Sequence, residues 1–180
     1  MQNKLSSERV TLRPASIQDK RNLYNWLAHS NLTAEMLGPP HFPDAPAPTW
    51  EEFDQDYLDY YFDGSQPLSG RCFIILHNQE EIGQINYNEI DTQSNSTEID
   101  IWLSDRKFTG KGLGTEAIIL LCDYLHKELK CKTIIIAPSK RNSNAIKAYK
   151  KAGFVETDWL PEDFTPDYHD AVVMVKIMSR

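Results

Sequence analysis

The chain has 180 residues, of which 41% are hydrophobic and 25% charged, and its formal net charge is -7. This composition is that of a globular protein with a core, and it excludes wholesale disorder. The acidic balance argues against nucleic acid as the main partner and favours a cationic one. We therefore expect one domain spanning residues 1–180.

The cysteines and the apolar runs bear on the cellular compartment. The three cysteines are scattered and odd in number, which predicts free thiols in a reducing environment. No apolar run approaches the length of a membrane span, and the polar N-terminus does not resemble a signal peptide. The five histidines show no metal-ligand spacing. We expect a cytoplasmic protein without membrane contact and without a metal.

The first half of the chain predicts helices around a proline-rich loop, followed by antiparallel strands. Ser16 with Asp19, and Thr49 with Glu52, have the spacing of helix-capping boxes. The predicted elements are a strand at 9–13, a helix at 16–29, a loop at 37–49, a helix at 49–63, and strands at 72–77 and 80–90 joined by a tight turn at 78–79.

The second half predicts a crossover helix between two strands. The elements are strands at 97–103 and 133–137 around a long helix starting near residue 113, a helix at 142–152, and strands at 154–157 and 171–178. The apolar stripe of the long helix is Leu113, Ala117, Leu120, Leu121, Tyr124, Leu125 and Leu129. A single crossover helix implies one parallel pair within a mixed sheet.

The stretch FTGKGLGTEA (residues 108–117) connects the strand at 97–103 to the long helix. Its glycines allow the backbone to approach a ligand at a helix N-terminus, where free N–H groups and Lys111 would hold a phosphate. The spacing fits neither a Walker loop nor a dinucleotide fingerprint. The alternative is a tight turn that binds nothing.

The strand at 97–103 places two carboxylates on one face. Glu98, Asp100 and Trp102 alternate with Ile99, Ile101 and Leu103. Carboxylates close to the phosphate loop are candidates for acid–base chemistry, because an amine acceptor must lose a proton before it attacks an acyl group. The alternative is an ordinary solvated face.

Two motifs together resemble the GNAT superfamily of acyl-CoA-dependent N-acyltransferases. They are the loop GKGLG and the segment NSNAIKAYKKAGF (residues 142–154), which matches the signature Asn-x-x-Ala-x-x-x-Tyr-x-x-x-Gly-Phe at every fixed position. The resemblance covers nearly the whole chain. Within the superfamily, VTLRPASIQDKRNLYNWL, IDIWL and IIAPSKRNSNAI resemble the aminoglycoside 6'-N-acetyltransferase branch, whose frame ribosomal-protein and polyamine acetyltransferases share.

This resemblance implies an α/β fold, a mostly antiparallel mixed sheet with a central parallel pair flanked by helices. It also implies acetyl-CoA as co-substrate. One departure is Thr109, where superfamily members often carry Arg or Gln. The cofactor-binding residues implied are Leu103, Thr109, Gly110, Lys111, Gly112, Leu113, Gly114, Thr115, Asn142, Ala145 and Tyr149.

The catalytic roles also follow from the resemblance. Asp100 matches the general base of the aminoglycoside branch, with Glu98 as second choice, and Tyr149 matches the general acid that protonates the leaving thiolate. A strand bulge near Leu103 would aim a backbone N–H at the oxyanion. Tyr149 could instead be a core aromatic, and Asn142 a helix N-cap.

The acceptor is expected to be a small cationic amine, similar to an aminoglycoside or a polyamine. Superfamily members flank the acceptor cleft with segments that correspond to residues 49–63 and 158–170, which here interleave carboxylates with aromatic residues. Candidate contacts are Trp102, Asp163, Asp167 and Tyr168. The alternatives are solvated surface loops, a protein N-terminus or lysine as acceptor, or a non-catalytic acyl-CoA-binding module. A monomer or a homodimer is expected.

Overall fold

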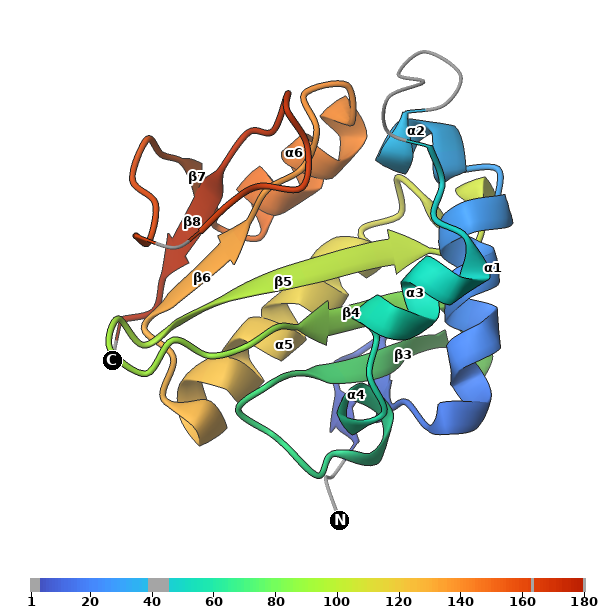
Figure 1. Ribbon diagram of the computed structural model, residues 1–180, viewed down its shortest axis with the longest axis horizontal. Coiled ribbons are helices and arrows are strands. Elements are labelled where there is room, and N and C mark those ends of the chain that lie inside the picture. The colour runs from blue at the N-terminus through green and yellow to red at the C-terminus, as the bar shows by residue number, and fades with distance from the viewer. Residues whose placement is uncertain (1–3, 39–45, 163, 180) are drawn as a thin grey trace.

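The computed structural model describes residues 4–38, 46–162 and 164–179, which form a mixed eight-stranded sheet with helices on both faces (Figure 1). The strands are β1 (Leu5–Ser6), β2 (Thr11–Pro14), β3 (Arg71–His77), β4 (Glu80–Tyr87), β5 (Ser96–Leu103), β6 (Thr133–Ile136), β7 (Val155–Glu156) and β8 (Met174–Ile177). The helices are α1 (Lys20–His29), α2 (Thr33–Leu37), α3 (Trp50–Asp56), α4 (Tyr60–Asp63), α5 (Leu113–Leu129) and α6 (Ser143–Lys151).

The strand order is β1-β2-β3-β4-β5-β6-β8-β7, and every recorded pairing is antiparallel except that of β5 with β6. The predicted fold class is therefore confirmed, including the parallel pair produced by the crossover helix α5. The predicted turn at Asn78 and Gln79 is confirmed as well, because both residues have the positive φ values of a tight hairpin.

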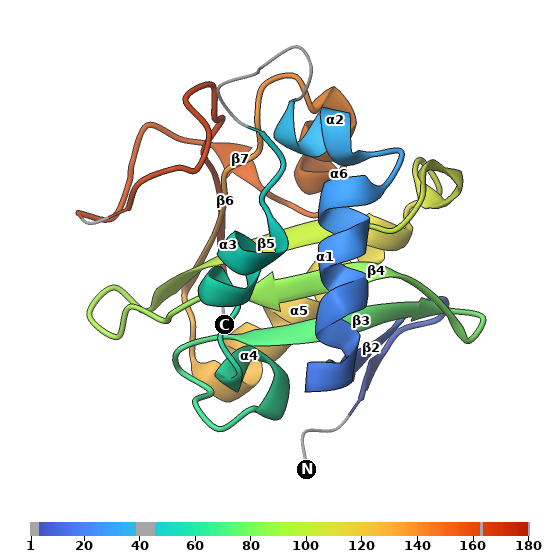
Figure 2. The same ribbon diagram turned by 45° about the vertical axis from the view of Figure 1, so that its right-hand side comes forward.

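Two hydrophobic clusters cover the two faces of the sheet. Helix α5 packs against one face, and α1, α3 and α4 pack against the other (Figure 2). On β5 the two clusters alternate along the strand, since Ile99 belongs to the α5 cluster and Trp102 to the opposite one. The predicted alternation of faces on β5 is thus confirmed.

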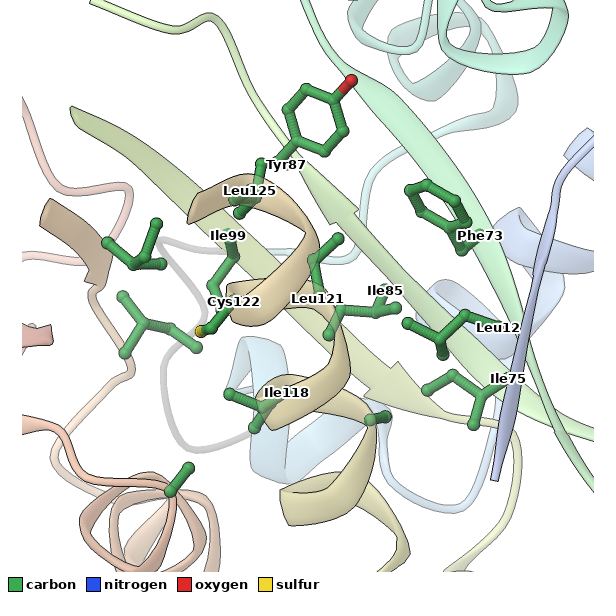
Figure 3. Packing of buried hydrophobic residues seen from close by; sticks show 14 of the residues in the cluster. Leu12, Phe73, Ile75, Ile85, Tyr87, Ile99, Ile118, Leu121, Cys122 and Leu125 are labelled. Atoms are coloured by element: carbon green, nitrogen blue, oxygen red, sulfur yellow. The ribbon is translucent and has the colours of Figure 1, made fainter. Parts of the chain in front are cut away.

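Helix α5 is the main support of the sheet (Figure 3). Leu121 and Leu125 lie among Leu12, Ile85 and Ile99 from the strands, and all five side chains are fully buried. The predicted stripe is largely confirmed, although Ile118 and Cys122 are also buried, whereas Leu120, Tyr124 and Leu129 only border the cluster.

The pairing of β5 with β6 stops halfway along β5. The last recorded pair is Glu98 with Ile135, yet β5 continues to Leu103. Figure 1 shows the two strands side by side where they begin and diverging beyond that point. Strand β4 stays paired with β5 as far as Leu103, so it fixes the position of the diverging half.

One local prediction was wrong, and one helix was not predicted. Residues 49–63 do not form one helix: the Thr49 capping box is present, but α3 ends at Asp56, because the next residue, Tyr57, has a φ of -99° and a ψ of 76°, which are not helical. The Tyr57 ring stacks on Phe53 at 4.5 Å and meets Trp102 edge-on at 6.0 Å, which turns the chain toward the sheet. Helix α2, which packs against α1, was not predicted.

Cys72, Cys122 and Cys131 are free thiols, and all three are buried. Burial raises the pKa of the Cys122 thiol to about 12 and that of Cys131 to about 11. Within the described ranges, no helix is both long enough and apolar enough to cross a membrane.

Replacing Leu121 with alanine should lower the free energy of unfolding by about 2–5 kcal/mol, because it leaves a cavity beneath the sheet. The matched control is Ile119→Ala on the same helix, where the side chain is 39% exposed and little should change. Denaturant unfolding of both variants measures the difference. Equal losses would mean that α5 does not pack as described.

Candidate active site

A cleft of about 350 Å³ lies between β5, the glycine loop and α6. The left-handed φ values of Gly110 (72°) and Gly112 (79°) fold the loop so that α5 begins at Leu113 on the cleft wall. The predicted cofactor residues that line the cleft are Leu103, Thr109, Gly110, Gly112, Leu113, Gly114, Thr115, Asn142, Ala145 and Tyr149.

Lys111 is the one predicted cofactor residue that does not line this cleft. Its side chain is exposed and is not part of the cleft wall, while its carbonyl oxygen accepts a hydrogen bond from Arg9 Nη1 at 3.0 Å. Arg9 also forms an ion pair with Glu116 at 2.7 Å, in the first turn of α5. Arg9 therefore braces the glycine loop against the helix.

Helix α6 contributes the opposite wall of the cleft. Lys147 and Lys151 line it and supply the positive charge that Lys111 does not. Both lie in the segment NSNAIKAYKKAGF, but the spacing of its lysines did not predict which of them line the cleft. Asn142 caps α6 by accepting a hydrogen bond from the Ala145 N–H at 3.2 Å, so the N-cap role is confirmed.

The second cavity, of about 200 Å³, adjoins the first. The two share Met36, Ile101, Trp102, Asn142 and Tyr149 as lining residues. The second pocket is acidic and aromatic: it is lined by the carboxylates of Asp56, Asp100 and Asp167, by the rings of Phe53, Tyr57, Trp102, Tyr149 and Tyr168, and, among described residues, by no Lys or Arg.

Three of the four predicted acceptor contacts, Trp102, Asp167 and Tyr168, line this second pocket. Trp102 is fixed by a hydrogen bond from its Nε1 to the Leu23 carbonyl at 3.2 Å. Asp163, the fourth, lies outside the described residues. Asp56 was not singled out, because its place on the pocket wall depends on the break of the helix at Tyr57.

Glu98 and Asp100 are half-buried, which excludes the solvated-face alternative. Burial and the charges of Asp100 and Asp167 raise the pKa of Glu98 to about 9. Burial and Asp167 also raise the pKa of Asp100 to about 6, while hydrogen bonds from Asn88 and Asn86 act in the opposite direction. Of Glu98 and Asp100, Asp100 alone lines the second pocket, so it is the one of this pair that a ligand there would meet.

Tyr149 is both a core aromatic and a site residue. Its ring is buried and tilted against Phe154 at 6.4 Å, and it lines both cavities. Burial, together with the charges of Asp100 and Tyr168, raises the pKa of its hydroxyl, so the group keeps its proton at neutral pH.

The backbone of β5 also faces the cavities. Hydrogen bonds from the Asn88 N–H to the Glu98 carbonyl and from the Ser104 N–H to the Ile82 carbonyl show that even-numbered residues of β5 bond to β4. The N–H groups of Ile101 and Leu103 therefore point to the other side, where β6 has diverged. The bulge predicted near Leu103 is absent, because β4 and β5 pair regularly through Leu103; the early end of the β6 pairing opens the strand instead.

Helix α2 closes the larger cleft from the other side, with Leu32, Glu35 and Met36 on its wall. An ion pair between Glu35 and Arg106 ties α2 to the loop that follows β5, and Arg106 Nη2 also donates to the Asn31 carbonyl at 2.9 Å. No sequence signal marked these residues. Among the residues described, no cluster of three or more His, Cys, Asp or Glu could hold a metal.

A helix N-terminus with glycines, open to a cleft that meets an acidic pocket, is the arrangement of a transferase with two substrates. The family model described as an acetyltransferase (GNAT) domain matches residues 9–155. The chain therefore belongs to the GNAT acetyltransferase family, and the predicted family and enzyme class are confirmed.

Two curated relatives cover most of the chain. The chain is 29% identical over 159 residues to the aminoglycoside N(6')-acetyltransferase type 1 of Klebsiella pneumoniae, covering 83% of this chain and 75% of the relative. It is 27% identical over 171 residues to the spermidine N(1)-acetyltransferase of Escherichia coli K12, covering 94% and 86%.

A solved structure gives the same picture. The aminoglycoside acetyltransferase AAC(6')-Ib in complex with coenzyme A and kanamycin superimposes with a TM-score of 0.69 at 28% identity, over 93% of this chain and 94% of that one.

The raised pKa of Glu98 predicts a pH-dependent stability. Between the ordinary pKa of a glutamate and about 9, the folded state binds the Glu98 proton more tightly than the unfolded chain does, so stability falls as pH rises through this window. Glu98→Gln should remove this loss, so the Tm of the variant relative to wild type should be higher at pH 9 than at pH 6. Glu128→Gln on the exposed side of α5 is the control. Parallel Tm profiles for wild type and Glu98→Gln would contradict the assignment.

Proposed function

We propose that the protein transfers an acetyl group from acetyl-CoA to a primary amine of a small polycationic acceptor. The observation that carries the proposal is the meeting of the two cavities at Trp102 and Tyr149, with Asp100 on the acidic side and the glycine loop on the other. A donor in the cleft and an amine in the pocket would reach each other there.

The co-substrate, acetyl-CoA, fits the residues of the larger cleft. The N–H groups from Gly110 to Gly114 at the start of α5 would bind its pyrophosphate, with the helix dipole adding partial positive charge. Lys147 and Lys151 would face its phosphates from α6. A Cβ at Gly110 would meet nothing within 4 Å, which leaves that backbone open to a ligand. The relative AAC(6')-Ib binds coenzyme A.

Asp100 acts as the general base. Its pKa of about 6 leaves the carboxylate mostly ionised at neutral pH, so it can take a proton from the acceptor ammonium. The free amine then attacks the acetyl carbonyl carbon. The backbone N–H groups of Ile101 and Leu103 face the opened side of β5, where they would stabilise the negative charge that develops on the carbonyl oxygen.

Tyr149 acts as the general acid. Its hydroxyl holds a proton at neutral pH and lies where the two cavities join. It would give that proton to the sulfur as the carbon–sulfur bond breaks. The proton that the attacking nitrogen loses as the amide forms would restore the Tyr149 hydroxyl, so that free thiol and the acetylated amine leave. Glu98 stays protonated at neutral pH and takes no proton in this scheme.

The acceptor class follows from the charge of the second pocket. Asp56, Asp100 and Asp167 converge on it among tyrosine and tryptophan rings, a combination that binds ammonium groups through charge and cation–π contact. The relatives that act on aminoglycosides and spermidine take acceptors of this kind.

Asp100→Asn is the direct test of the mechanism. We expect kcat/KM to fall by about 10²–10⁴-fold at neutral pH, the usual contribution of a general base. The deficit should shrink at high pH, where more of the acceptor is already unprotonated. Release of free thiol from acetyl-CoA, with kanamycin or spermidine as acceptor, gives the rate. Full activity at neutral pH would remove Asp100 from the reaction.

Asp167→Asn tests the acceptor assignment. Removing this carboxylate should raise the KM for a polycationic acceptor by about 2- to 5-fold and leave the KM for acetyl-CoA unchanged. Added salt should weaken acceptor binding by wild type more than by the variant. Asp123→Asn on α5 is the charge-matched control. A preferred acceptor that is neutral, with no dependence on salt, would overturn the acceptor class alone.

A further inference from the structure

Polar side chains of β4 and of Asn88, the residue that follows it, form a chain of hydrogen bonds that ends at Asp100. Gln84 Nε2 donates to Asn86 Oδ1 at 3.1 Å, and Asn86 Nδ2 donates to Asn88 Oδ1 at 2.8 Å. Asn88 Nδ2 then donates to Asp100 Oδ2 at 3.0 Å. Gln84 and Asn86 are fully buried, so water does not compete for these bonds.

The orientation of the Asn88 amide is fixed by its surroundings. Its Oδ1 accepts from Asn86 Nδ2 and also from the Tyr61 hydroxyl, at 3.2 Å. Reversing the amide would turn its NH₂ toward the Asn86 NH₂ and its oxygen toward the Asp100 carboxylate, which is unfavourable at both ends. The backbone of Asn88 is held as well, because its N–H donates to the Glu98 carbonyl at 2.9 Å.

Both amides contact the same carboxylate oxygen. Asn88 at 3.0 Å and Asn86 at 3.4 Å each donate to Asp100 Oδ2. Within the described part of the chain, Asp100 Oδ1 accepts no hydrogen bond, and Asp100 lines the acidic pocket. The bound oxygen and the free oxygen of one carboxylate therefore differ in their surroundings.

We propose that Asn88 is a positioning residue for the transfer reaction: anchored by Asn86 and Tyr61, it holds Oδ2 of Asp100 and leaves Oδ1 to take the proton of the acceptor amine. This inference rests on the proposed role of Asp100 as general base. Asn88 lines neither cavity, so it acts through Asp100 and not on the substrate.

The other groups around Asp100 make these amides important. Glu98 is its neighbour on the same face of β5. The titratable groups that face it from other elements are Cys72, Tyr57, Tyr61, Tyr149, Asp167 and Tyr168. None of these groups is a cation, and burial works against the charge. Hydrogen bonds from Asn88 and Asn86 are what lower the pKa of Asp100 in this setting.

The test is the pH dependence of kcat/KM for Asn88→Ala, with acetyl-CoA and whichever of kanamycin and spermidine wild type acetylates faster. Loss of one hydrogen bond to an ionised carboxylate should move the acid limb upward by about 1 to 2 pH units. The rate should recover toward wild type at high pH. The acceptor's own pKa is common to all variants, and a merely structural role would lower the rate equally at every pH.

Two tyrosine variants complete the set. Tyr61→Phe removes one hydrogen bond that holds Asn88. It should move the acid limb upward, by less than Asn88→Ala does. Tyr87→Phe is the control. The Tyr87 hydroxyl lies on the opposite face of β4 and donates to the Pro67 carbonyl at 2.8 Å, so its removal should not move the acid limb. If Asn88→Ala does not fold, Tyr61→Phe decides by the same criterion.

The outcomes separate the two claims. Suppose that Asp100→Asn is inactive but the acid limb does not move in Asn88→Ala, or in Tyr61→Phe where Asn88→Ala does not fold. This result overturns the role of Asn88 and leaves Asp100 as the general base. An Asp100→Asn protein with full activity and the wild-type profile overturns the proposed mechanism itself. A limb that moves upward in Asn88→Ala and Tyr61→Phe, but not in Tyr87→Phe, supports the inference.

Discussion

The site depends on the point at which β5 and β6 part. Beyond the pair of Glu98 and Ile135, one side of the β5 backbone has no neighbouring strand, and its N–H groups need another partner. Strand β4 keeps that half of β5 in place, and Gly83 permits the close contact: a Cβ there would lie 2.4 Å from the Trp102 carbonyl oxygen. A rigid strand with one open edge can bind a ligand through its backbone without any special side chain.

The acidic side of the site is held at a cost to stability. Glu98 and Asp100 are half-buried on the same face of β5, and among the described residues the charges that shift their pKa values are carboxylates. Burial and mutual repulsion disfavour two negative charges, so Glu98 stays protonated at neutral pH, while hydrogen bonds from Asn88 and Asn86 favour the ionised form of Asp100. A cationic ligand would relieve this repulsion, which links binding of the acceptor to stabilisation of the fold.

Much of the site could be predicted because its signals are local. The glycine spacing of residues 110–114 and the alternation on β5 depend on a few consecutive residues, and the structure has both. Asn86 and Asn88 were missed, because the sequence shows only that they lie on the same face of their strand. They reach the Asp100 carboxylate because Asn86 pairs with Asp100 in the sheet, and this register cannot be predicted from the sequence. The break at Tyr57 depends on Trp102, which tertiary packing supplies. The place of Lys147 and Lys151 on the cleft wall could not be predicted, because it depends on where α6 packs.

The buried thiols have a practical consequence for studying the enzyme. Cys72, Cys122 and Cys131 are buried, and burial keeps them in the unreactive thiol form. A chromogenic disulfide reagent added to native protein should therefore give little background colour, and the signal during turnover would come from the released coenzyme. The same reagent would react with all three cysteines once the chain unfolds, so one dye reports both catalysis and loss of structure.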